Sequence, residues 1–122
     1  MDTKTFKEFF DKSLQFTVLF RKNSLTDLMA AIKSVGSYNN FSGRHVAKFI
    51  QELENDGFYF SAEFGRDYSP VLFLQTSEEN FKKFNIEQRA KAKSVAANEI
   101  QTAYMGYEGE EARDVRVRIW WD

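Results

Sequence analysis

The last segment of the chain, VRVRIWWD at residues 115–122, has the clearest spacing of side chains that could bind a partner. Alternate side chains of an extended strand point to opposite faces, so Arg116, Arg118 and Trp120 would share one face. Arginine pairs well with carboxylates and tryptophan supplies a large apolar surface, a combination typical of protein interfaces. The other face of the same strand would carry Val115, Val117, Ile119 and Trp121. The segment therefore predicts one buried face and one face that contacts a protein partner or a second copy of the chain.

Tyr59 is a further candidate for this contact surface. The segment VLFLQ, residues 71–75, has apolar side chains in both alternating sets and therefore needs cover on both faces. Two arrangements satisfy this requirement. Either all helices pack on the opposite face, and Tyr59 and Trp120 join Leu72 and Leu74 in an exposed apolar patch flanked by the two arginines, or a helix covers this face and buries Trp120.

Residues 24–75 follow the element order of a winged helix, namely helix, turn, helix and hairpin. The polar side of the second helix and the expected tip of the hairpin carry residue types that reach phosphates and base edges. These candidates are Arg44, His45, Lys48, Gln51 and Arg66. A winged-helix-like, DNA-binding transcriptional regulator is therefore the alternative function.

Two features count against DNA binding. The connection from Gly36 to Ser42 is longer than the short turn of a helix-turn-helix motif. Glu52, Glu54 and Asp56 place negative charge at the end of the proposed recognition helix, where they would repel phosphates. The whole chain has 17 Lys and Arg against 18 Asp and Glu, a net charge of -1, so it lacks an overall basic field. A protein partner is therefore favoured over a nucleic acid.

No pattern of catalytic or metal-binding residues is present in the sequence. His45 is the only histidine, and the positive charges of Arg44 and Lys48 near it oppose its protonation. The chain has no phosphate-binding glycine loop, nucleophile elbow or paired-histidine helix motif. Two groups of carboxylates are interpreted as solubilising surface rather than as a hydrolase or calcium site. They are Glu52, Glu54, Asp56, Glu63 and Asp67 in one region and Glu108, Glu110 and Glu111 in another. We therefore expect a protein that is not an enzyme and has no cofactor and no metal.

The composition predicts a single globular domain over residues 1–122. The chain is 43% hydrophobic and 29% charged and contains 13 Phe, enough large apolar side chains for one core. It contains no cysteine, which excludes disulfides and thiolate metal sites and indicates a reducing, cytoplasmic setting. The N-terminal residues mix charged and apolar types, unlike a signal peptide or a membrane span. A compact, cysteine-free chain of this size also suits the small inhibitors or regulators that phages and mobile elements encode.

Hydrophobic periodicity predicts the order helix, strand, helix, helix, hairpin, helix, strand. Helices are expected from Asp2 or Thr3 to about Ser13, over residues 25–35, between Ser42 and Gly57, and from Thr76 to about Met105, the last as one helix or two. Strands are expected at residues 14–22, 58–64, 71–75 and 115–122. Ala103 and the other alanines of the last helix would let it lie close on the sheet. The predicted class is α+β, with a small mixed or antiparallel sheet of about four strands and helices packed mainly on one face.

Overall fold

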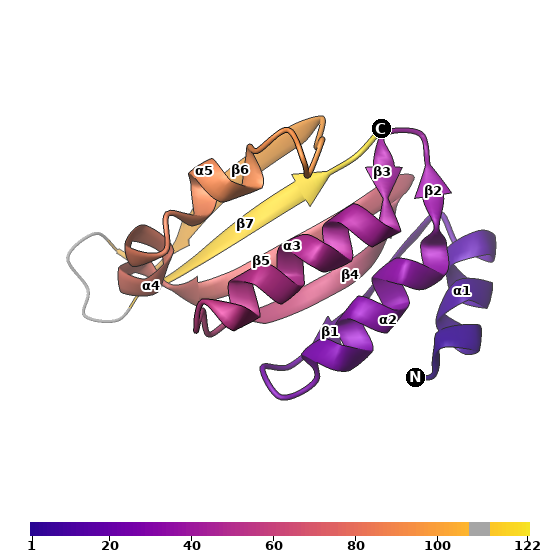
Figure 1. Cartoon of the computed structure of the whole chain (residues 1–122), viewed down its shortest axis with the longest axis horizontal. Coiled ribbons are helices and arrows are strands. Elements are labelled where there is room, and N and C mark those ends of the chain that lie inside the picture. Colours follow the sequence, from indigo (N-terminus) through magenta and orange to yellow (C-terminus); the bar gives the residue numbers. More distant parts are fainter. Residues whose placement is uncertain (108–112) are drawn as a thin grey trace.

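The computed structural model describes residues 1–107 and 113–122 and has an α+β architecture (Figure 1). Within these residues the helices are α1 (Thr3–Lys12), α2 (Leu25–Val35), α3 (Gly43–Asn55), α4 (Glu78–Lys83) and α5 (Ile86–Ala90). The strands are β1 (Gln15–Phe20), β2 (Ser37–Tyr38), β3 (Phe41–Ser42), β4 (Ser61–Asp67), β5 (Ser69–Ser77), β6 (Glu99–Met105) and β7 (Asp114–Trp120). The predicted α+β class is confirmed.

Five of the strands form one antiparallel sheet in the order β1, β4, β5, β7, β6. Figure 1 shows the helices on one side of this sheet, with α2 and α3 lying over its central strands. β2 and β3 form a separate small hairpin between α2 and α3. The prediction that the helices pack mainly on one face is therefore confirmed, although the sheet has more strands than the sequence predicted.

Short polar side chains and a glycine set the ends of the helices. The Asp2 carboxylate accepts a hydrogen bond from the Thr5 N–H at 2.7 Å, and the Ser42 hydroxyl accepts one from the His45 N–H at 3.4 Å. These bonds satisfy backbone donors that the first helical turn leaves free. Gly36 follows α2 with a φ of 71°, a conformation that glycine adopts with little steric strain because it has no Cβ. In the described part of the chain, no helix has the length and apolarity needed to cross a membrane.

The hydrophobic core lies between the helices and the inner face of the sheet. Phe64 of β4, Leu72 of β5 and Ile119 of β7 stand in one row across the sheet and are fully buried. The Phe41 ring reaches the same layer, with its centroid 5.8 Å from that of Phe64 and 5.0 Å from that of Trp121. Trp121 is itself fully buried. The prediction that Trp121 belongs to the core is therefore confirmed.

The prediction of one or two helices from Thr76 to about Met105 is right for two short consecutive helices up to Ala90 and wrong for the rest of the segment. This segment forms the short helices α4 and α5 and then the strand β6, which pairs along its whole length with β7. Ile100 and Tyr104 lie on the inner face of β6, in the period-two pattern of a strand. Ala103 lies exposed on the opposite face instead of packing a helix on the sheet. Pairing with β7 therefore overrides the helix propensity of the alanine-containing segment.

Two further parts of the structure differ from the prediction. The first strand of the central hairpin begins at Ser61, although Phe58 and Phe60 before it are buried. The segment between α2 and α3 was predicted as a turn and forms the β2–β3 hairpin, with Asn39 at a φ of 48°. Asparagine adopts this left-handed conformation more readily than most residues, which explains how so short a hairpin closes.

Candidate functional site

The candidate site is the face of the five-stranded sheet that points away from the helices, and we call it the open face. Cross-strand pairing assigns to it Gln15, Thr17 and Leu19 of β1, Glu63, Gly65 and Asp67 of β4, Val71 and Phe73 of β5, Gln101 and Ala103 of β6, and Arg116, Arg118 and Trp120 of β7. Figure 1 shows the helices on the other side of the sheet. Of the two arrangements that the sequence allowed, the described residues therefore adopt the one in which no helix covers this face.

Arg116 and Glu63 form an ion pair that crosses β5 on the open face. One guanidinium nitrogen of Arg116 lies 3.1 Å from Oε2 of Glu63. The same carboxylate oxygen accepts a hydrogen bond from the Thr17 hydroxyl at 3.2 Å. The guanidinium also lies over the Phe73 ring, 4.2 Å from its centroid, as in a cation–π contact. Arg116 is therefore held in one orientation by a carboxylate of β4 and a ring of β5.

Arg118 and Asp67 form a second ion pair of the same kind. A guanidinium nitrogen of Arg118 lies 3.0 Å from Oδ2 of Asp67, and the Gln15 amide donates to Oδ1 of Asp67 at 3.2 Å. The Gln15 amide and then the Arg118 guanidinium hold the pKa of Asp67 below its ordinary value, because both stabilise the charged carboxylate. Asp67 thus links β1 to β7 on the open face.

Trp120 lies across the open face. Its indole N–H donates a hydrogen bond to the backbone carbonyl of Asp67 at 3.0 Å, over the intervening strand β5. Val71 of β5 pairs directly with Trp120 and is fully buried, although its side chain points away from the core. Leu72 and Leu74 lie in the core on the other face, so the prediction that they share a face with Trp120 is wrong. Trp120 is half-buried. We attribute the burial of Val71 to the indole that lies beside it, so part of the Trp120 surface is already used within the chain.

An open depression of about 420 Å³ lies on the open face beside the two ion pairs. Thr17, Glu63 and Phe73 contribute to its lining, so its walls are both polar and apolar. Gly65 lies between β1 and β5 in the same region, and a Cβ atom there would stand 2.1 Å from the carbonyl oxygen of Phe16. Glycine is therefore required for β1 and β4 to pair so closely beside this depression.

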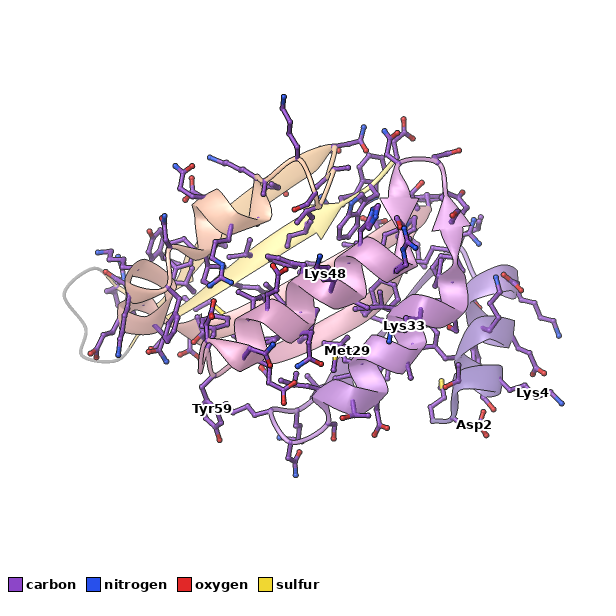
Figure 2. The ribbon with its side chains drawn as sticks, viewed as in Figure 1. Asp2, Lys4, Met29, Lys33, Lys48 and Tyr59 are labelled. Atoms are coloured by element: carbon purple, nitrogen blue, oxygen red, sulfur yellow. The ribbon has the colours of Figure 1, made fainter. Side chains whose placement is uncertain are left out.

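Tyr59 is exposed but stands apart from Trp120. It precedes Ser61, at the end of the sheet where Arg116 lies, whereas Trp120 is at the other end of β7. Figure 2 shows the Tyr59 side chain projecting away from the ribbon. The ammonium nitrogen of Lys22 lies 3.8 Å from the centroid of its ring. Tyr59 is therefore at the rim of the open face, and the predicted interface residues do not form a single cluster.

Four residues proposed for the alternative DNA-binding function are exposed on α3, namely Arg44, His45, Lys48 and Gln51. Figure 2 shows Lys48 on the side of α3 that faces away from the sheet. A depression of about 230 Å³ beside this helix is lined by His45, Lys48, Phe49, Glu52 and Ser94. The surface of α3 thus mixes basic groups with the Glu52 carboxylate and is not a uniformly basic patch.

Arg66 lies within β4 and not at the tip of a free wing. The tip of the β4–β5 turn is Tyr68, and both strands are interior members of the five-stranded sheet. The Arg66 guanidinium donates hydrogen bonds to the carbonyl oxygens of Phe10 at 2.7 Å and Tyr68 at 2.9 Å, and to the hydroxyl of Tyr38 at 3.2 Å. Its donors therefore connect α1 and β2 to the sheet.

The carboxylates weighed as catalytic or metal-binding groups have other positions. Glu63 and Asp67 pair with arginines on the open face, and Asp56 pairs with Arg89 at 2.7 Å. Within residues 1–107 and 113–122, no group of three or more potential ligands is close enough to hold a metal ion. The acidic residues Glu108, Glu110 and Glu111 lie outside the described residues.

Comparison of the chain with models of protein families, with curated proteins and with solved structures gave no match.

Proposed function

We propose that this protein is a non-enzymatic accessory protein that binds another protein through its open face. The observation that supports the proposal best is an uncovered sheet face on which two arginines and a tryptophan are already oriented by contacts within the chain. Side chains that are ordered before binding lose less conformational entropy when a partner arrives. Arginine and aromatic residues are also the types that dominate the energetics of protein interfaces.

The charges of the open face favour a protein over a nucleic acid as the partner. Arg116 and Arg118 each have a carboxylate partner, Glu63 and Asp67, so the four charges balance locally. A surface that binds phosphates needs an excess of basic groups, and this face has none. A protein partner can instead use hydrogen bonds to the paired groups and apolar contact with Leu19, which is 52% exposed.

The setting and role of the protein belong to the same proposal. We place it in the cytoplasm because the chain contains no cysteine, as is common where thiols are kept reduced. Its small size and lack of catalytic motifs suit an inhibitor or regulator, including the type that phages and mobile elements encode. Binding to a host or cellular protein would then change the activity of that protein.

The test compares two leucines of similar exposure on different surfaces. Leu19, on the open face, is 52% exposed, and Leu14, which precedes β1, is 56% exposed. Leu14 lies in the bend before β1, outside the strands that form the open face. We expect Leu19→Asp to weaken partner binding by about tenfold or more, because it adds an unpaired charge at the contact, and Leu14→Asp to leave binding unchanged.

Tagged parent and variants are incubated with an extract of the organism that encodes the chain, and bound proteins are quantified by mass spectrometry after nuclease treatment. The expected result is a protein that the parent and Leu14→Asp retain and that Leu19→Asp loses. Circular dichroism of each variant confirms that it is folded. Equal retention by both variants, or retention that depends on nucleic acid, would contradict the proposal.

A further inference from the structure

The strand β6 forms one edge of the five-stranded sheet and pairs only with β7. Figure 1 shows it along the outer margin of the sheet. In the described part of the chain, residues 99–105 make no backbone hydrogen bond on the side away from β7. The outward N–H and C=O groups of a strand of 7 residues are therefore available to pair with another strand.

The sequence of β6, EIQTAYM, lacks the devices that keep strand edges apart. Such devices are lysine, proline and β-bulges. β6 contains neither residue, and its register with β7 is unbroken from Glu99 opposite Trp120 to Met105 opposite Asp114. Tyr104 and Met105 are each 44% exposed, so the edge also presents apolar surface. This edge is unprotected against pairing.

The opposite edge of the sheet, β1, is flanked differently. Lys12 ends the helix before β1, and Arg21 and Lys22 follow the strand directly. Cations at both ends of an apolar strand oppose its pairing with a like strand. β6 is preceded by Asn98 and followed by Gly106, which add no such charge. Of the two edges, β6 is therefore the one suited to association with a copy of itself.

β6 is complementary to itself in one antiparallel register. If Thr102 lies opposite Thr102 of a second copy, Ile100 lies opposite the second copy's Tyr104, and Glu99 lies opposite its Met105. Threonine pairs and aromatic–aliphatic pairs are favourable across strands. The single charged residue of the strand, Glu99, is then separated from its copy by the length of the strand, about 20 Å at 3.4 Å per residue.

We propose that β6 pairs with β6 of a second copy around a two-fold axis at Thr102. Antiparallel pairing of residues on the same face keeps the helices of both copies on one side, so the two sheets join into one of about ten strands, within the range of known sheets. The two open faces then form a continuous surface on the other side. The pairing does not depend on any partner of the open face.

The absence of native cysteine allows a direct test. Residues directly opposite in an antiparallel pair have Cα atoms about 4.5–5.5 Å apart, which a disulfide can bridge. We expect the Thr102→Cys variant to form a covalent dimer under mild oxidation, at least about tenfold faster than the Leu19→Cys variant, whose cysteine lies on β1. Sedimentation of the unmodified chain should give twice the monomer mass as its concentration is raised.

A second variant separates pairing from unfolding. Thr102→Lys places two ammonium groups opposite each other on the two-fold axis, so it should remain monomeric while its circular dichroism stays that of the parent. A parent that stays monomeric at about 1 mM would overturn the proposal, because the Kd of the dimer would then lie above about 1 mM. So would a dimer that Thr102→Lys leaves intact, an assembly larger than a dimer, or faster cross-linking at Leu19→Cys than at Thr102→Cys.

Discussion

The indole N–H of Trp120 donates a hydrogen bond to the backbone carbonyl of Asp67, 3.0 Å away and on the far side of strand β5. The side chain of Asp67 pairs with Arg118, which is on the same strand as Trp120. Asp67 therefore fixes two of the residues proposed to contact a partner. The open face owes its order to these contacts between distant segments of the chain.

Trp121→Ala should destabilise the protein more than Trp120→Ala does. Trp121 is fully buried and donates its indole N–H to the Val95 carbonyl at 2.7 Å, so its removal should cost about 3–5 kcal/mol. Trp120 is half-buried, covers Val71 and makes one hydrogen bond, so its removal should cost about 1–2 kcal/mol. Urea unfolding followed by far-ultraviolet circular dichroism measures both values.

Trp120→Phe serves as the control in this comparison. It keeps a smaller aromatic ring near Val71 and removes the indole donor, so it should cost less than Trp120→Ala, about 1 kcal/mol. Equal destabilisation by Trp120→Ala and Trp121→Ala would mean that the open face is as buried as the core. That outcome would remove the basis for a partner on this face.

Gly65→Ala should weaken the pairing of β1 with β4. The added methyl group would stand 2.1 Å from the Phe16 carbonyl oxygen, so the two strands would have to move apart. Overpacking of this kind typically costs about 1–3 kcal/mol. Ser61→Ala, on the same strand and half-buried, is the matched control and should change stability by about 0.5 kcal/mol or less. Thermal unfolding measures the difference, and equal midpoints would contradict the predicted clash.

The local patterns of the sequence predicted most of the elements that lie over or within the sheet. Alternation in VRVRIWWD correctly separated the buried Trp121 from Trp120, because the side chains of a strand follow its period wherever the strand is placed. The hydrophobic periodicity of the segments that form α2 and α3 also predicted these two helices correctly. The segment that became β6 was predicted as the end of a helical region reaching to about Met105, and it is the pairing with the neighbouring strand β7 that makes it a strand.

The partners of the site residues could not be predicted in the same way. Glu63 and Asp67 were interpreted as solubilising carboxylates, although they pair with Arg116 and Arg118 across β5. These pairs depend on which strands are neighbours and in what register, which is tertiary information that a single sequence does not contain. The same reason explains Arg66, which was expected at a wing tip and instead connects α1 to the sheet.

We expect the protein to show no specific binding to duplex DNA. The Arg66 guanidinium is engaged by Phe10, Tyr38 and Tyr68, so it is not offered together with Arg44 and Lys48 of α3. Fluorescence anisotropy with labelled duplex at low salt measures binding. Tight binding that weakens in the Arg44→Ala and Lys48→Ala variants would support the alternative function instead. The slope of log K against log salt concentration should then fall by about one unit in each variant.

Stability should fall as the pH is lowered through the range in which Glu78 takes up a proton. Glu78 begins α4, and its carboxylate accepts hydrogen bonds from Arg113 and from Lys82. The Arg113 guanidinium, and after it the Lys82 ammonium, lowers the pKa of Glu78 from 4.5 to about 2. Because the folded pKa lies below the unfolded one, the unfolded chain binds the proton more readily. The stabilisation by Glu78 is therefore complete above pH 4.5 and is lost as the pH falls towards 2.

Glu78→Gln isolates this contribution from those of the other carboxylates. The difference in unfolding midpoint between parent and variant should be largest near neutral pH and should shrink as the pH falls from 4.5 towards 2, because the parent then loses the charge that the variant already lacks. Glu79→Gln removes the next carboxylate of the same helical turn but keeps Glu78, so its unfolding midpoint should approach that of Glu78→Gln over the same pH range, as the midpoint of the parent does. Thermal scans at a series of pH values measure the difference. If the gap between parent and Glu78→Gln stays constant from neutral pH to pH 2, the Arg113–Glu78 pair does not hold the start of α4 to β7 in the way that the structure indicates.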